Sequence, residues 1–336
     1  MKKSLHKPRG FLRHIGAGVA GLLACLAVAT PTWATAKYEY PVKEVTLVVP
    51  YPAGGNSDSL GRIYAERLRD KLGITVIVEN RPGGTTSLGT GQVARSKPDG
   101  ATLLLATSTA FTVLPHLRND LPYDPEKSFT FVGSLAGYLP IMTARTELGV
   151  KSYQDLIDLA KSKPGELTWG SSGIASGGHL AGEIVKNLTG ADMLHIPFKG
   201  SADTIPALLG GHVDFIIDGV ALELIKSGRS QGLATFSNIR HPELPDVPAL
   251  SEVAPDAVLP FQGFWGIAVA AGTPDSLVDT LAKATADILA EPDTQQRFLR
   301  SSLSAEWLPG DEYQQELAKS RVYYGELLKK IGLTTQ

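Results

Sequence analysis

The stretch Thr46–Arg67, TLVVPYPAGGNSDSLGRIYAER, decides how this chain folds. A run typical of a β-strand, from Val45 to Val49, ends in a proline, and a helical pattern of apolar residues begins near Ser57. Between them, Gly54 and Gly55 let the backbone turn tightly and let a ligand approach it closely. A strand, a glycine turn and a helix N-terminus together form an anion site without a charged side chain, because the first N–H groups of a helix are unpaired.

Three side chains beside this turn are candidate ligand contacts. Tyr51 is expected to form a wall of the binding cleft. Ser57 or Asp58 is predicted to cap the helix, since a short side-chain oxygen accepts from first-turn N–H groups. Asp58 has a second interpretation, in which its carboxylate accepts from a hydroxyl or ammonium group of the ligand. Both interpretations stay open.

The first 36 residues predict an export signal rather than part of the folded protein. Five basic residues precede an apolar run from Ile15 to Ala29, and Ala34–Ala36 is a small-residue cleavage site. The apolar run is too short for a membrane-spanning helix. Cleavage after Ala36 would place the protein in the periplasm. An alternative is a bacterial lipoprotein signal, in which Cys25 is lipidated and becomes the N-terminus.

Charge and cysteine content exclude several classes of protein. The chain has 32 basic and 34 acidic residues, and removal of the first 36 residues, which hold five of the basic ones, leaves a net charge of −7. This balance disfavours nucleic-acid binding, which needs a basic face. Cys25 is the only cysteine, so a chain cut after Ala36 has neither thiol chemistry nor a disulfide. About 300 residues remain, a length typical of two domains.

The rest of the chain alternates short β-type runs with amphipathic helices, which predicts an α/β fold with mixed or parallel sheets. We expect two α/β domains with a ligand cleft between them and two crossover strands. Domain I would comprise residues 37–138 and 264–336, and domain II residues 139–263. The crossings, which would act as hinges, are expected near Gly137 and in the extended run Phe261–Gly266.

A second turn is predicted to face the first one, so that the two form a clamp. The loop Ser171–Gly178 holds three serines and three glycines ahead of a helix. Ser172 and Ser176 are the expected hydroxyl donors to a ligand. His179 opens the helix, and it either contacts the ligand or has a capping or packing role. The alternative for the whole loop is a flexible surface connection, which is less favoured because loops on a rigid sheet so often carry binding.

A third helix start follows at Gly200, Ser201 and Ala202, where Ser201 is expected to cap the helix and still face the cleft. Asp218 follows the strand predicted over Val213–Ile217. It points to the sheet edge at which ligands of open α/β sheets gather. The alternative for Asp218 is an ordinary turn aspartate.

The motifs of the common enzyme classes are missing. The sequence has no G-x-S-x-G elbow and no P-loop lysine, and the glycine-rich run Gly89–Ala94 lies too far past its strand for dinucleotide binding. The histidines after residue 36 show no paired metal spacing. We therefore expect neither a cofactor nor a metal. Serine, histidine and aspartate do occur together in the expected cleft, so a periplasmic hydrolase or isomerase stays an alternative.

Eight short stretches stand out along the chain. They are Pro52–Gly55 with Asp58 and Arg62, Val78–Gly84, Lys97–Gly100, Leu121–Asp124, the serine–glycine loop with His179–Ala181, Ile196–Gly200, Gly210–Asp214 and Leu244–Pro248. In this order they resemble the Bug (TctC-like) family, the extracytoplasmic solute-binding proteins of tripartite tricarboxylate transport systems. Each stretch is weak alone, but eight in sequence are specific, and the likeness runs from about Tyr40 to Leu333.

The resemblance implies two α/β domains that close on a ligand, as in type II periplasmic binding proteins. It implies a small organic carboxylate held by backbone amides, hydroxyls and waters, with membrane components of a tripartite tricarboxylate-type transporter as partners. We expect a monomer. Ser108 and Thr109 are expected to form a further wall of the pocket. Phe198 stands where tyrosine is commoner in the family, which removes a hydroxyl near the cleft. A ligand sensor for a signalling receptor is the alternative to transport, and the sequence does not identify the carboxylate.

Overall fold

The computed structural model of the protein describes residues 38–257 and 263–333. The expected export signal with its cleavage site and Cys25 lies outside the described residues, as do residues 261–262 of the second expected crossing. Within the described ranges, no helix is long and apolar enough to cross a membrane.

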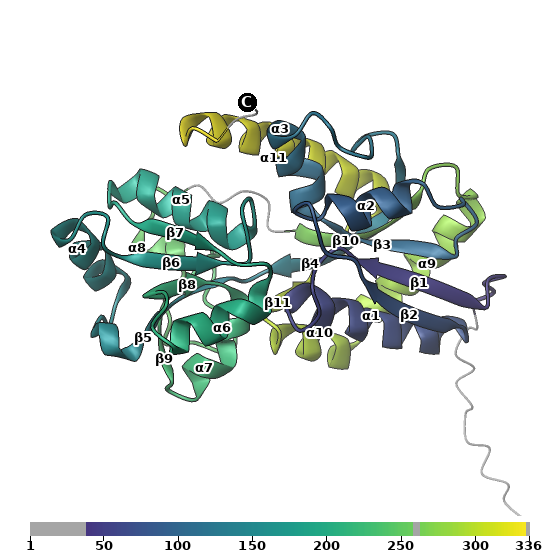
Figure 1. Ribbon diagram of the computed structural model, residues 1–336. Coiled ribbons are helices and arrows are strands. Elements are labelled where there is room, and N and C mark those ends of the chain that lie inside the picture. The colour runs from purple at the N-terminus through teal and green to yellow at the C-terminus, as the bar shows by residue number, and fades with distance from the viewer. Residues whose placement is uncertain (1–37, 258–262, 334–336) are drawn as a thin grey trace, which may run out of the picture. The chain divides into compact units, whose positions relative to one another are not determined.

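The first of two sheets has six strands in the order β11-β4-β10-β3-β1-β2 (Figure 1). The strands are β1 (Glu44–Val49), β2 (Thr75–Asn80), β3 (Thr102–Thr107), β4 (Phe129–Tyr138), β10 (Gly263–Ala270) and β11 (Leu303–Ala305). β1 is parallel to β2 and β3, whereas β10 runs antiparallel between β3 and β4, and β11 runs antiparallel to β4. The sheet is therefore mixed.

Helices cover both faces of this sheet. α1 (Asn56–Leu72) and α10 (Pro292–Leu299) lie on one side, and α2 (Ser87–Ala94), α3 (Leu114–Leu117) and α11 (Gly310–Lys330) lie on the other (Figure 1). The side chains of β1 alternate between the two cores, as the strand pleat requires. Leu47 packs with α1, α9 (Asp275–Leu289) and α10, whereas Val48 packs with α2 and α11.

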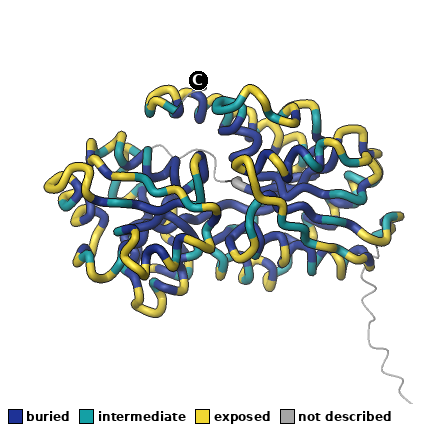
Figure 2. Tube along the Cα trace, viewed as in Figure 1, coloured by how far each residue is buried: buried dark blue, intermediate teal, exposed yellow. Residues whose placement is uncertain are grey.

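The second sheet has five strands in the order β7-β6-β8-β5-β9. They are β5 (Ile141–Arg145), β6 (Thr168–Ser171), β7 (Leu194–Pro197), β8 (Phe215–Ile217) and β9 (Ser230–Thr235). α4 (Tyr153–Ser162), α5 (Gly177–Thr189) and α8 (Leu250–Val253) pack on one face, and α6 (Ser201–Leu209) and α7 (Leu222–Lys226) on the other. Buried residues run along the strands of both sheets (Figure 2). The predicted α/β class with mixed sheets is confirmed.

The chain passes from the first sheet to the second between β4 and β5, just beyond the expected crossing at Gly137. Gly137 itself stays in the sheet, where it pairs with Gly263 of β10 and Ser304 of β11. A Cβ at Gly137 would lie 2.2 Å from the Glu306 carboxylate, so the glycine allows close packing rather than a turn. The chain leaves the sheet next to Pro140, which has no N–H to donate to a strand ladder.

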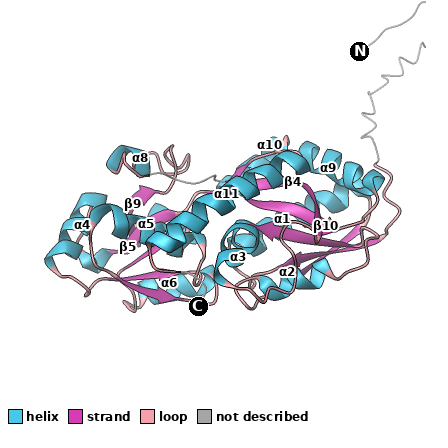
Figure 3. Ribbon diagram, turned by 90° about the horizontal axis from the view of Figure 1, so that it is seen from above, coloured by secondary structure: helices cyan, strands magenta, loops and turns pink. Residues whose placement is uncertain are grey.

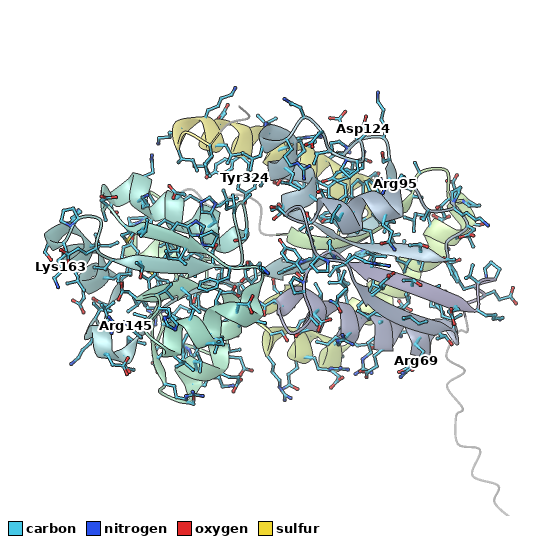
Figure 4. All side chains as sticks on the ribbon, in the orientation of Figure 1. Arg69, Arg95, Asp124, Arg145, Lys163 and Tyr324 are labelled. Carbon is cyan, nitrogen blue, oxygen red and sulfur yellow. The ribbon has the colours of Figure 1, made fainter. Side chains whose placement is uncertain are left out.

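Helix α11 reaches the helices of the second sheet. Tyr324, labelled in Figure 4, and Leu328 form one apolar cluster with Val113 of the first sheet's layer. Ala175 and the α5 residue Leu180 belong to the same cluster. Figure 3 shows α11 next to α5. The back of the predicted loop Ser171–Gly178 is therefore covered by the C-terminal helix.

Candidate functional site

The turn after β1 forms where the sequence predicts it, but its cap differs. Gly54 has a φ of +87°, in the left-handed region that side chains disfavour. Helix α1 begins at Asn56, and its N-cap is Gly55 with an extended backbone. Ser57 and Asp58 already lie inside the first helical turn, and no side chain makes a cap hydrogen bond. The prediction that Ser57 or Asp58 caps this helix is therefore wrong.

This first turn lies directly against the start of helix α6. A Cβ placed on Gly55 would lie 3.4 Å from the Cβ of Ser201, and one on Gly54 would lie 3.5 Å from the Cβ of Ala202. The N-cap of α6 is Gly200, without a side-chain hydrogen bond, so the prediction that Ser201 caps the helix is also wrong. Two helix starts, one from each sheet, thus face each other so closely that one added carbon atom on either glycine would be in van der Waals contact.

A cavity of about 90 Å³, called the first cavity below, lies at this meeting point. Its lining residues are Tyr51, Pro52, Ala53, Gly55, Asn56, Ser57, Tyr138, Ser172, Gly177, Gly200, Ser201, Ala202, Asp203 and Trp265. The structure thus brings seven predicted contacts to one place: Tyr51, Gly55, Ser57, Ser172, Gly200, Ser201 and Ala202. The other seven predicted residues, Gly54, Asp58, Ser108, Thr109, Ser176, His179 and Asp218, do not line it.

Helix N-termini dominate the electrostatics of the first cavity. Its lining includes the first residues of α1, α5 and α6, whose dipoles favour an anion. Of the described lining residues, none is lysine, arginine or histidine, and Asp203 is an exposed acid in the first turn of α6. The Ser57 hydroxyl accepts the indole N–H of Trp265 at 3.1 Å.

The hydrogen bonds of Asp58 hold the first turn in its conformation. Its carboxylate accepts the Gly54 N–H at 2.9 Å, the Asn80 amide at 3.0 Å and the Arg62 Nε at 3.0 Å. Burial raises the pKa of Asp58, but these hydrogen bonds, that of Arg62 first, outweigh burial and leave the pKa below its usual value. The side chain thus ties the glycine turn to α1 and β2, and the structure shows no approach from it to the first cavity.

Replacing Asp58 with alanine is expected to lower the free energy of unfolding by about 2 kcal/mol, because three partly buried hydrogen bonds lose their charged acceptor. The contribution is present above the unfolded pKa of about 3.9 and is lost as the pH falls through the lower folded-state pKa. Urea unfolding of Asp58→Ala at pH 7 and at pH 3 measures both effects. Asp70→Ala, an exposed acid on the same helix, is the matched control. Equal stability of the two variants at pH 7 would contradict this role.

Asp218 lies at the centre of a buried polar network that joins the two sheets. Its Oδ1 accepts from the Tyr138 hydroxyl at 2.8 Å, from the Asn56 amide at 3.3 Å and from the Val220 N–H at 3.2 Å. Burial raises the pKa of Asp218, and hydrogen bonds from Ser201, Tyr138 and the backbone offset this only in part. Asp218 also caps the short helix Gly219–Ala221. Asp218 does not line the first cavity, but its partners Tyr138, Asn56 and Ser201 do.

The residues of the predicted serine–glycine loop have different roles. Ser172 lines the first cavity, whereas Ser176 caps helix α5 by accepting the His179 N–H at 3.3 Å. The Nδ1 of His179 accepts the Ala175 N–H at 3.0 Å, and its ring stacks on His195 with centroids 4.2 Å apart. Of the two roles left open for His179, the structure therefore shows packing and loop closure.

A serine–histidine pair does occur beside this loop, but at an unexpected residue. The Ser171 hydroxyl lies 2.7 Å from the Nε2 of His195. Ser171 is fully buried and is absent from the lining of the first cavity, where its neighbour Ser172 lies. The pair therefore has no access to a ligand there. Within the described part of the chain, no group of three or more His, Cys, Asp or Glu residues could hold a metal ion.

The two stacked histidines are expected to stay neutral from pH 8 down to pH 5. Burial lowers the pKa of His179 to about 4, and burial with the neighbouring His179 and Lys186 lowers the pKa of His195 to about 3. Because the unfolded pKa is about 6.5, the unfolded chain takes up the protons first, so the pair reduces stability as the pH falls below that value. Imidazole NMR signals titrating near pH 6.5 for either residue would contradict this.

Ser108 and Thr109 lie behind the site rather than in it. The Ser108 hydroxyl lies 3.0 Å from that of Thr112, at the start of a short π-helical turn, Thr109–Val113. The Thr109 hydroxyl donates to the Ala175 carbonyl at 3.4 Å. Burial raises the pKa of the Tyr51 hydroxyl, and its hydrogen bond with Thr109 offsets the rise only in part. Thr109 thus supports Tyr51, which lines the cavity.

Sequence reasoning missed the aromatic side of the first cavity. Tyr138 and Trp265 come from β4 and β10, and their rings meet edge to face with centroids 5.2 Å apart. Both are strand residues without a nearby motif. The one available signal was their position at the expected crossings between the domains. Asn56 was also missed, although it follows the glycine pair directly and donates across to Asp218.

Comparison with known proteins gives a consistent result. The family model described as the tripartite tricarboxylate transporter family receptor matches residues 60–333. Protein BugT of Bordetella pertussis is 35% identical over 235 residues, which cover 69% of this chain and 71% of BugT. The structure of the periplasmic binding protein BugD superposes with a TM-score of 0.81 at 32% identity, covering 88% of this chain and all of BugD.

A third relative was solved with a ligand. Rpa4515 of R. palustris with adipate superposes with a TM-score of 0.82 at 27% identity, covering 89% of this chain and 100% of that one. The family model describes a transporter receptor and BugD is a periplasmic binding protein, so the hydrolase or isomerase alternative has no support from them. The chain belongs to the tripartite tricarboxylate transporter receptor family, whose members are periplasmic binding proteins and not enzymes.

Proposed function

We propose that this protein captures a small organic carboxylate in the first cavity and delivers it to the membrane components of a tripartite tricarboxylate-type transporter. The observation that carries the proposal is the meeting of three helix N-termini at a cavity whose described lining contains no basic side chain. A carboxylate has only acceptor atoms, so it is bound by N–H groups and hydroxyls. Helix dipoles then take the place of an arginine.

Individual groups of the cavity suit this role. The Ser57 hydroxyl lines the cavity and accepts from the Trp265 N–H, so its own proton is the part of the group that can be donated to a ligand. Ser172 supplies a second hydroxyl from the opposite sheet. Ser201 is directed to Asp218, whose pKa it lowers, so this hydroxyl holds the network rather than the ligand. The ligand would thus be held from both sheets at once, which couples binding to closure.

Three further features follow from the same proposal. The division into domain I, residues 37–138 and 264–336, and domain II, residues 139–263, would let the two sheets move as separate bodies. Pro140, between β4 and β5, lies at one of the two crossings. Export to the periplasm, with cleavage after Ala36, would place a monomer where the transporter receives its ligand. An adipate complex of a relative supports a carboxylate as the cargo.

The test is a thermal-shift panel on residues 37–336, the chain that remains after cleavage at Ala36. Mono-, di-, tri- and amino-carboxylates are compared with neutral sugars and polyols, and isothermal titration calorimetry follows each hit. We expect stabilisation by carboxylates alone. Stabilisation only by ligands without a carboxylate would overturn the proposal. A pull-down of transporter and receptor components with and without ligand separates transport from sensing, which differ only in the partner.

A further inference from the structure

A second, larger cavity of about 530 Å³ lies next to the first. Tyr51, Pro52 and Ser172 line both cavities, so the two are neighbouring parts of one cleft. The first cavity has room for about six to nine water-sized groups, because one water needs roughly 10–15 Å³. A carboxylate with a short carbon chain would fill it. Any longer ligand must extend into the second cavity.

One wall of the second cavity is the loop between β2 and α2. Gly83, Gly84, Thr85 and Thr86 have φ values of +129°, +55°, +52° and +80°. Such values are costly for the two threonines and persist only where the surrounding structure holds the backbone in place. The wall is therefore preformed by the protein rather than shaped by its ligand.

The opposite wall is apolar. Ile174 lines the cavity with 53% of its surface exposed, which leaves a large apolar side chain in water. The Phe198 ring lies close to Gly170, where a Cβ would be 3.0 Å from the ring, and the Phe198 N–H donates to the Ser171 carbonyl at 2.9 Å. The Phe198 ring is thus fixed on the second sheet. An apolar ligand group that covers the exposed Ile174 side chain would remove a large apolar surface from water.

The second cavity carries little charge. Among the described residues that line it, the one lysine is Lys199, which is exposed, and no aspartate or glutamate takes part. An exposed lysine keeps its ammonium group in water. Proline, glycine, isoleucine and phenylalanine make up most of the remaining lining residues. The first cavity is therefore the polar end of the cleft, with helix N-termini in its lining, and the second cavity is the apolar end. Tyr51 lines both and lies between them.

We propose that the second cavity holds the apolar body of a ligand whose carboxylate occupies the first cavity. The substrate class would then be carboxylates with an extended alkyl or aryl body, rather than compact hydroxy-di- or tricarboxylates. This inference rests on the proposed function, because the first cavity must bind the carboxylate. Burying one methylene at full depth improves a dissociation constant about fourfold, so affinity rises steeply with chain length.

The experiment uses isothermal titration calorimetry with propionate, butyrate, hexanoate and octanoate, and with succinate and malate as compact comparators. The wild-type chain without its first 36 residues is compared with Ile174→Asn. Ile239→Asn is the matched control, because Ile239 is 62% exposed and lines neither cavity. We expect the wild type and Ile239→Asn to bind hexanoate at least tenfold more tightly than butyrate. In Ile174→Asn this gain falls to about threefold or less.

Three results would overturn the inference. One is an affinity that stays flat or falls from propionate to octanoate, and another is an unchanged chain-length gain in Ile174→Asn. The third is tighter binding of succinate or malate than of hexanoate, in which case the proposed function stands and the inference alone fails. If the wild type binds none of these carboxylates but binds another carboxylate of the thermal-shift panel, the inference alone fails. If it binds no carboxylate of either set, the proposed function fails and the inference falls with it.

Discussion

Replacement of Asp218 by alanine is expected to lower the free energy of unfolding by about 3 kcal/mol and to weaken carboxylate binding. Asp218 is 1% exposed, and its Oδ1 accepts from Tyr138, Asn56 and Val220. Removal of the acceptor leaves these donors buried without it. Tyr138 and Asn56 line the first cavity, so loss of their common anchor also loosens the cavity wall. Urea unfolding and calorimetry on Asp218→Ala measure the two effects.

The isosteric variant Asp218→Asn separates hydrogen bonding from charge. It keeps a carbonyl acceptor for Tyr138 but removes the cost of a buried negative charge. Because the folded-state pKa of Asp218 is raised, the wild type's contribution from this group is complete below the unfolded pKa of about 3.9 and is lost as the pH rises through the folded-state pKa. As the pH rises from about 3.9 through the folded-state pKa, Asp218→Asn should therefore become more stable relative to the wild type.

The opposite result is equally informative. If Asp218→Ala unfolds at the same urea concentration as the wild type, the network does not hold the sheets together. If the stability difference between the wild type and Asp218→Asn does not change with pH, the carboxyl group does not titrate in the buried state that the structure shows.

Ala202→Asp is expected to weaken binding of the tightest carboxylate in the panel by about 100-fold. Ala202 lines the first cavity at the second position of α6, close to the first turn. Two negative charges roughly 5 Å apart repel by about 3 kcal/mol at an effective dielectric constant of about 20. The fold should tolerate the substitution, because Ala202 is exposed and an acid is favourable in the first turn of a helix.

Ala202→Asn is the control for this prediction, since it has the same size and lacks the charge. Calorimetry of both variants, with thermal unfolding to verify their folding, distinguishes the causes. Equal losses in the two variants would indicate crowding rather than repulsion. Undiminished binding by Ala202→Asp would show that the anionic group of the ligand lies elsewhere than at the start of α6.

Local features of the fold could be predicted because their causes are local. The turn at Gly54 depends on a left-handed backbone that glycine adopts without strain, and α5 ends at Gly190 for the same reason. The alternation of strands and helices follows from apolar periodicity. α10 and β11 were not predicted, because a short helix and a three-residue strand have too few residues to show a period.

The candidate site was predictable only in part, for a similar reason. Ser57, Ser172 and Ser201 follow strands in glycine-rich turns, and the carboxyl ends of parallel strands meet at one edge. Asp58 and His179 belong to the same turns, yet their side chains hold the loops instead. Residue type and position are the same for both roles. Only the partners of each side chain, which are set by packing, distinguish them.

The sequence by itself determined the α/β layers, the glycine turns that leave helix N-termini open, and the family. These depend on backbone preferences and on patterns within about 20 residues. The tertiary structure alone decided that α6 lies against the first turn, that Tyr138 and Trp265 cover the cavity, and that Asp218 joins the sheets from within. The physical reason is that these contacts join segments whose approach depends on strand order and register. Local sequence preferences do not determine how the two sheets meet.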